Sequence, residues 1–359
     1  MTRHFFPGGN TPLGFYNLFD SISCGGERTI HIKGASGCGK STFMKKAAET
    51  FESMGFDVER FHCSNDAQSL DGVRVPKAGV SIVDATAPHV SDPAIPVAHD
   101  EIFNMADFIN QKMVSKHKNE LESLTRQKKQ YFTKAYHYLA AAGLVVKNNE
   151  AIYKNALDQS KLNAAIMDAL STFEGMYSSA KAGKNRKLFA SAVTPDGYIN
   201  YTDSLLDEKI TYVLSGEMGM GADIFLDNIR NAANLRGFDT ESLHCPMNPG
   251  KTEHLIIPGM DLCFTTKNKH HSANVTNQTK EINFDDFLDE EAISKAQSEI
   301  EYNTSMFDEL TGKAIKILAE QRVFHERIEE IYIPAMDFER LTIACDKIIA
   351  EMVDCAKML

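Results

Sequence analysis

One glycine-rich stretch contains the residue types that hold a polyphosphate: Gly34-Ala35-Ser36-Gly37-Cys38-Gly39-Lys40-Ser41-Thr42. It fits the pattern G-x-x-x-x-G-K-[ST], in which the glycines let backbone N–H groups turn toward a phosphate. Lys40 would place a positive charge on the β- and γ-phosphates, and Ser41 would ligate the Mg2+ that bridges them. The stretch therefore predicts a site for ATP with Mg2+. The alternative is a glycine-rich turn that binds nothing.

The flanking residues favour the phosphate site. Arg28–Lys33 alternates polar and apolar residues and predicts a strand before the loop, and residues 41–54 predict a helix after it. A strand, a glycine loop and a helix N-terminus in this order direct unpaired N–H groups and the helix dipole to one point. We therefore expect residues 34–42 to bind an anion.

A carboxylate follows on a later strand. The apolar strand predicted at 79–84 ends in Asp84, as does the strand whose acid holds Mg2+ in phosphate-loop NTPases. Ligands of parallel sheets bind at the carboxyl ends of the strands, so Asp84 is expected beside the loop. A solvated aspartate at a strand end is the alternative.

Other polar residues are expected at the same edge of the sheet. Thr86 and His89 could position an attacking water or face a second substrate, or could belong to an ordinary loop. His62 and Cys63 end the strand predicted at 58–63 and should point toward the same site. Their spacing does not make a four-ligand zinc site.

The chain contains this pattern twice. After a shift of 182 the loop glycines recur: Gly34, Gly37 and Gly39 fall on Gly216, Gly219 and Gly221. Upstream segments match at a shift of 183 and downstream segments at 179. So few length changes over the whole chain indicate a tandem duplication. The polar linker 181–186 places the boundary between domains 1–183 and 184–359.

The order of elements in each copy predicts an α/β fold. We expect two tandem P-loop NTPase-like domains with mostly parallel sheets, covered on both faces and each extended by helices. The tails 100–179 and 284–359 should form a helical subdomain or hairpin beside each sheet. Such a fused pair would be an internal pseudo-dimer. The aromatic and glycine segment 5–16 could cover the adenine or clasp the two repeats together.

The second loop lacks the chemical groups of the first. Ala222 stands in the place of the lysine and Asp223 in the place of the hydroxyl, and the strand that corresponds to Asp84 ends in Thr265-Thr266. A lost charge-assisted contact costs roughly 1.5–3 kcal/mol, and a carboxylate near a phosphate adds repulsion unless it recruits a metal ion. We interpret the second repeat as a catalytically silent copy.

A basic cluster is present in the first helical tail only. Arg126, Lys128 and Lys129 suggest a lid that touches phosphates on closure, although a solvated helix face has the same composition. The shift of 179 places Ser305, Phe307 and Asp308 at these positions in the second repeat.

Composition excludes some classes of function. The 359 residues carry a net charge of −11, which argues against a nucleic-acid-binding surface. Seven cysteines without a C-x-x-C pair fit reduced thiols, and the longest apolar run is too short to cross a bilayer. We therefore expect a cytoplasmic protein that binds a nucleotide, does not contact a membrane, and could have a protein partner.

Segments 4–11, 34–42, 61–63 and 84–89 resemble a family of bacterial ATP-binding proteins, largely uncharacterised, with two P-loop NTPase repeats in one chain. The resemblance covers essentially the whole chain. It implies ATP binding and ATPase activity and does not supply a substrate. Both repeats of that family can carry a loop lysine, so Ala222 and Asp223 depart from its pattern.

Three functions are compatible with these features. The first is a Mg2+-dependent ATPase that uses Lys40 and Asp84, with Arg230 and Arg236 as arginine-finger candidates by position alone. The second is a small-molecule or nucleotide kinase whose acceptor faces residues 85–93. The third is a scaffold or sensor that binds ATP without hydrolysing it.

Overall fold

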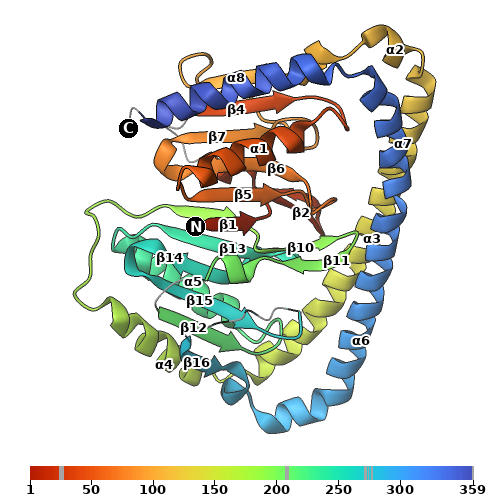
Figure 1. Ribbon diagram of the computed structural model, residues 1–359. Coiled ribbons are helices and arrows are strands. Elements are labelled where there is room, and N and C mark those ends of the chain that lie inside the picture. The colour runs from red at the N-terminus through yellow and green to blue at the C-terminus, as the bar shows by residue number, and fades with distance from the viewer. Residues whose placement is uncertain (24–27, 207–209, 271–272, 274, 276–277, 358–359) are drawn as a thin grey trace.

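Two six-stranded mixed sheets, one from each repeat, form the centre of the protein (Figure 1). This computed structural model describes residues 1–359 except 24–27, 207–209, 271–272, 274, 276–277 and 358–359. The first sheet has the order β1 (Thr2–Phe5), β5 (Val58–His62), β6 (Leu70–Val75), β7 (Val80–Asp84), β4 (Arg28–Lys33) and β8 (Asp100–Asn104). The second sheet has the order β16 (Gln278–Asn283), β12 (Ile210–Ser215), β15 (Leu262–Lys267), β14 (Asn248–Ile257), β13 (Thr240–Cys245) and β9 (Asn185–Leu188).

Each sheet is parallel except for one strand. In the first sheet β6 runs antiparallel to both neighbours, β5 and β7, while the other pairs are parallel. The expected strands at 28–33, 58–63 and 79–84 are present to within one residue, whereas β6 was not expected from the sequence. Gly72 interrupts its apolar pattern and leaves only Val73 and Val75 in alternation, which is a weak strand signal.

A smaller sheet joins the two repeats. Its order is β11 (Gly197–Asn200), β10 (Ser191–Thr194), β2 (Gly8–Thr11) and β3 (Gly14–Asn17). β10 pairs with β2 at Val193 and Asn10, which occupy equivalent positions of the two repeats. The aromatic and glycine segment 5–16 therefore clasps the repeats together.

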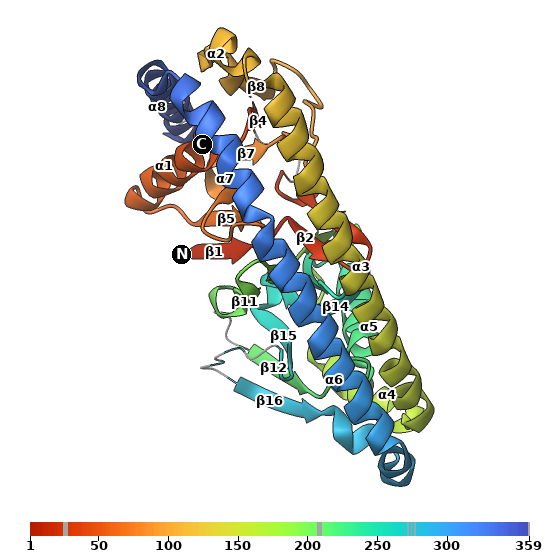
Figure 2. The same cartoon turned by 90° about the vertical axis from the view of Figure 1, so that its right-hand side faces the viewer.

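Two long helical segments run beside both large sheets (Figures 1 and 2). α3 (Lys118–Ala156) follows the short helix α2 (Gln111–Ser115), and α6 (Glu290–Glu320) continues into α7 (Arg322–Tyr332). α3 packs against α6 and α7 with the opposite chain direction. Among the described residues no helix is long and apolar enough to cross a bilayer.

The last helices of the two repeats are exchanged. α8 (Phe338–Lys357), from the second repeat, packs with α1 (Lys40–Ser53) on the first sheet through one core cluster. α4 (Gln159–Leu170), from the first repeat, packs with α5 (Ala222–Leu235) on the second sheet. The expected helical hairpin beside each repeat's own sheet is therefore wrong, because the long helices carry the chain to the other sheet.

Backbone hydrogen bonds fix this exchange at both ends of the molecule. Asn110 N–H donates to Ala335 C=O at 2.8 Å, and at the equivalent positions Asp289 N–H donates to Ala156 C=O at 2.8 Å. Among the described helices, α1 and α8 pack on one face of the first sheet and α4 and α5 on one face of the second, so helices do not provide the cover that was expected on both faces. The opposite faces share a core cluster that contains Phe5, Phe61 and Val83 from the first sheet and Leu188, Leu243 and Ile256 from the second.

Candidate functional site

The loop at 34–39 connects β4 to the N-terminus of α1. Gly37 and Gly39 adopt positive φ values of 75° and 89°, which L side chains rarely tolerate, and Lys40 is the first residue of α1. β4 lies between β7 and β8, and its Ile32 pairs with Asp84 in parallel register. The strand, loop, helix and adjacent acid are thus arranged as the sequence predicts.

Lys40 lies across the inside of this loop. Its Nζ donates to the carbonyl oxygens of Gly34 and Ala35, each at 2.9 Å, and lies 3.7 Å from Asp84 Oδ2. Ser41 Oγ accepts a hydrogen bond from Leu70 N–H at 3.0 Å. The lysine and the acid that the sequence assigned to one site therefore meet, and the hydroxyl lies on the next residue of the helix.

The side chains of Cys38 and Thr42, both expected to belong to the phosphate site, lie in different environments. Cys38 is 1% exposed, and its Sγ donates to Ala35 C=O at 2.9 Å, so it packs inside the loop. Thr42 is exposed on the first turn of α1. The side chain of Cys38 therefore packs within the loop, and that of Thr42 points to solvent.

Asp84 is held by the residues that follow it. Thr86 N–H donates to Asp84 Oδ1 at 2.9 Å, and Gly34 N–H donates to Thr86 Oγ1 at 3.1 Å. Thr86 therefore ties the carboxyl end of β7 to the start of the loop. Thr86 was one of two residues expected to position a water, and it instead bonds to Asp84 and Gly34.

A second carboxylate, Asp71, was missed by the sequence argument. The register of β6 and β7 pairs Gly72 with Val83, so the next step sets Asp71 opposite Asp84. Burial and the charge of Asp84 raise the pKa of Asp71 to about 8, although Cys63 and Lys40 lower it. The duplication could have indicated this acid. A shift of 182 aligns Asp71 with Glu253 and Cys63 with Cys245, so both repeats carry an acid and a cysteine at these positions, and Glu253 and Cys245 are buried.

His89 borders this pair of acids, whereas His62 faces away from it. His89 Nε2 lies 3.8 Å from Asp71 Oδ2, and its ring stacks on Phe19 with centroids 4.2 Å apart. Burial lowers the pKa of His89 to about 4, which keeps the ring neutral. His62 instead bonds through Nδ1 to Ala67 C=O and through Nε2 to His4 Nδ1, each at 2.8 Å.

Residues of the second repeat form the outer wall of the first loop. A methyl group added to Gly37 would lie 2.9 Å from Ile333 Cγ1 and 3.3 Å from Glu329 Cβ. A methyl group added to Gly39 would lie 3.4 Å from Leu341 Cδ2. The first site is therefore composite, with its loop from one repeat and its wall from the other.

One lysine of the predicted lid reaches the site. Lys128 is partly buried, and its Nζ donates to His325 Nδ1 at 2.7 Å. Burial and the charge of Lys40 lower the pKa of Lys128, while Cys63 and Glu329 raise it. Arg126 and Lys129 are exposed on the same helix.

The second loop has different neighbours. Asp223 pairs with Lys251 at 3.3 Å, and Lys251 also pairs with Glu150 at 3.2 Å. Asp223 is thus neutralised by a lysine, which is an alternative to the metal ion considered from the sequence. Glu150, from α3, also lies over Gly219, where an added methyl group would come within 2.6 Å of its Cγ.

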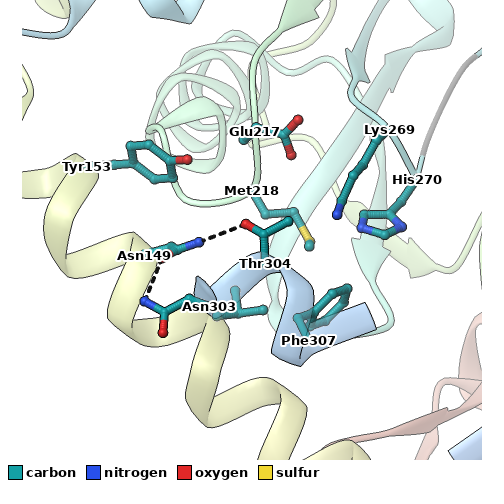
Figure 3. A pocket seen from close by; sticks show the side chains of 10 residues that line it. Asn149, Tyr153, Glu217, Met218, Lys269, His270, Asn303, Thr304 and Phe307 are labelled. Atoms are coloured by element: carbon teal, nitrogen blue, oxygen red, sulfur yellow. Dashed lines mark hydrogen bonds between the residues drawn. The ribbon is translucent and has the colours of Figure 1, made fainter. Parts of the chain in front are cut away.

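A small cavity borders the second loop (Figure 3). It has a volume of about 30 Å³, which is room for roughly one water molecule. Asn149 of α3 lines one side of it, donating to Thr304 Oγ1 at 3.3 Å and accepting from Asn303 Nδ2 at 2.8 Å. Glu217 of the loop also lines it, and burial and Asp285 raise the pKa of this acid.

The two arginines that were candidates for an arginine finger lie elsewhere. Arg230 pairs with Asp227 at 2.8 Å on its own helix, α5. Arg236 donates to Ala232 C=O at 3.1 Å and lies over the ring of Phe173. Both side chains are engaged in the second repeat, and neither has a described contact with the first loop.

Comparison of the chain with protein-family models, with curated proteins and with solved structures finds no match.

Proposed function

We propose that the first repeat binds ATP with Mg2+ and hydrolyses its terminal phosphoanhydride bond. The observation that carries the proposal is the approach of Lys40 Nζ to within 3.7 Å of Asp84 Oδ2, at the junction of a glycine loop and a helix N-terminus. Loop N–H groups and the dipole of α1 favour the phosphates. Lys40 donates to two loop carbonyls and would exchange these contacts for the β- and γ-phosphates.

The residues present fit a magnesium ion that arrives with the nucleotide. Ser41 supplies a hydroxyl oxygen and Asp84 a carboxylate oxygen, which are the hard ligands that Mg2+ prefers. Among the residues that the structure describes, no group of three or more His, Cys, Asp or Glu side chains could hold a metal by itself. Phosphate oxygens would complete the coordination, and the ion would neutralise charge on the terminal phosphates.

The pair of acids favours chemistry over passive binding. Asp71, opposite Asp84 and close to His89, is buried and can hold a proton near neutral pH. An attacking water must lose a proton as its oxygen bonds to the γ-phosphorus and the bond to the leaving ADP oxygen breaks. We assign that proton to Asp71 in its ionised form, whose share grows as the pH rises toward its pKa of about 8.

The test is calorimetric titration of ATP with Mg2+, combined with measurement of phosphate release from the same samples. We expect one site per chain in the wild type, no detectable binding in Lys40→Ala, and release of phosphate in the wild type only. Lys46→Ala is the control, because Lys46 lies on the same helix and makes only an exposed ion pair with Asp346.

The outcomes separate the three functions. Equal ATP affinity in the wild type and Lys40→Ala would overturn the nucleotide site. Transfer of the γ-phosphate to an acceptor other than water would indicate a kinase. Tight binding without release would indicate a sensor.

A further inference from the structure

A chain of three polar side chains spans the two repeats above the first loop. Lys128 of α3 donates to His325 Nδ1 at 2.7 Å, and His325 Nε2 lies 3.4 Å from Glu329 Oε1. An ammonium can only donate, so Nδ1 is the acceptor and the proton of the neutral ring lies on Nε2. The contact with His325 lowers the pKa of Glu329, which is therefore ionised.

The repeat symmetry places Lys128 opposite the phosphate loop. In the second repeat, Phe307 faces Met218 of the loop across the cavity of Figure 3. In the first repeat, the residue equivalent to Phe307 is Lys128, at a shift of 179. The residue equivalent to Met218 is Ser36, at a shift of 182. The repeat that lacks the loop lysine thus has an aromatic ring where the first repeat has an ammonium.

Lys128 contacts the carboxylate of Glu329 through His325, whereas Lys40 lies 3.7 Å from a carboxylate of its own, that of Asp84. Lys128 and Lys40 lie within each other's electrostatic field. A terminal phosphate carries more charge than one carboxylate and offers three acceptor oxygens. It would therefore compete with His325 for the ammonium.

We propose that Lys128 contacts the terminal phosphate of the bound nucleotide and in doing so leaves His325 and Glu329 of the second repeat. This inference rests on the proposed nucleotide site. ATP would then weaken a contact between α3 and α7 that ADP leaves intact, because only ATP offers the γ-phosphate. Lys128 would therefore distinguish ATP from ADP, and the contact between α3 and α7 would differ between the two nucleotide states.

The test compares the affinities of the non-hydrolysable imido analogue of ATP and of ADP, both with Mg2+, by calorimetry. In Lys128→Met we expect the preference for the triphosphate to fall roughly tenfold to a hundredfold, the range of one charge-assisted contact, with ADP affinity unchanged. Methionine keeps the apolar stem. Lys129→Met is the matched control, because Lys129 is the exposed neighbour.

Glu329→Gln provides a second variant that keeps the shape of the wall. Loss of the carboxylate should free Lys128 and raise the affinity for the triphosphate analogue several-fold relative to ADP. Equal triphosphate-to-diphosphate ratios in Lys128→Met and Lys129→Met would overturn the inference, as would a lower ratio in Glu329→Gln. Failure of the nucleotide site itself has a different signature, since the wild type would then bind neither nucleotide.

Discussion

The main chains of Phe6 and Phe189 are joined by two reciprocal hydrogen bonds, of 2.9 and 3.1 Å, although 183 residues separate them. The two phenylalanines are equivalent positions of the repeats. Antiparallel bonding between equivalent residues requires a two-fold relation, so the single chain reproduces the symmetry of a two-fold dimer. The same relation explains why each loop is walled by helices of the other repeat.

The two site acids should have separable effects. Asp84→Asn removes a magnesium ligand and should weaken Mg2+-dependent ATP binding. Asp71→Asn should retain binding and lose at least tenfold in phosphate release, because proton transfer contributes about 10²–10⁴-fold to catalysis. Glu253→Gln is the matched control, since it alters the equivalent buried acid of the silent repeat. Full turnover in Asp71→Asn would remove Asp71 from the mechanism.

The helix exchange predicts that a residue of the second repeat supports the first site. Leu341 is 4% exposed and lies against Gly39, and its equivalent Leu162 lies against Gly221. Either leucine changed to alanine should cost about 2–5 kcal/mol in the free energy of unfolding. Only Leu341→Ala should also weaken ATP binding. Urea unfolding and ATP titration of both variants check this, and an equal loss of ATP affinity in both would contradict it.

The interface between the repeats should be sensitive to acid. Burial alone would raise the pKa of Glu59, but Arg186, Arg74 and Arg3 outweigh it and lower the pKa to about 2. A pKa below the unfolded value means that Glu59 stabilises the fold above about pH 4.5 and that this stability is lost as the pH falls toward 2. The contribution is roughly 3 kcal/mol at neutral pH.

Glu59→Gln should therefore lower the free energy of unfolding at pH 7 and flatten its decline in acid. Urea unfolding between pH 7 and the acid limit measures both effects. Glu49→Gln is the control, because Glu49 is exposed on α1. An unchanged acid slope in Glu59→Gln would show that other groups dominate, such as His62, whose pKa burial lowers to about 4.

Restoring the loop residues alone should not create a second nucleotide site. The double change Ala222→Lys and Asp223→Ser rebuilds the sequence pattern, but Thr266 still stands where a carboxylate is needed. We expect calorimetry to report one ATP site per chain in this variant, as in the wild type. Two sites would show that the pattern alone is sufficient.

Features that depend on the order of neighbouring residues could be predicted from the chain alone. A strand, a glycine loop and a helix N-terminus are contiguous, so their junction at Lys40 follows from the residues 28–54 alone. Asp84 could be placed because the ends of parallel strands meet at one edge. The duplication could be detected because equivalent residues keep constant shifts along the chain.

Contacts between segments far apart in the sequence could be seen only in the folded protein. Asp71 reaches the site only through the antiparallel strand β6, whose short apolar pattern is broken by Gly72. The exchange of α4 and α8 could not be predicted, because equivalent sheets present similar apolar faces and either helix would fit either one. The 39 residues of α3 span about 58 Å and carry the chain past its own sheet to the other. In the second repeat, α6 and α7 carry the chain in the same way to the first sheet, and their length, rather than any local preference, places Glu329 and Leu341 beside the first loop.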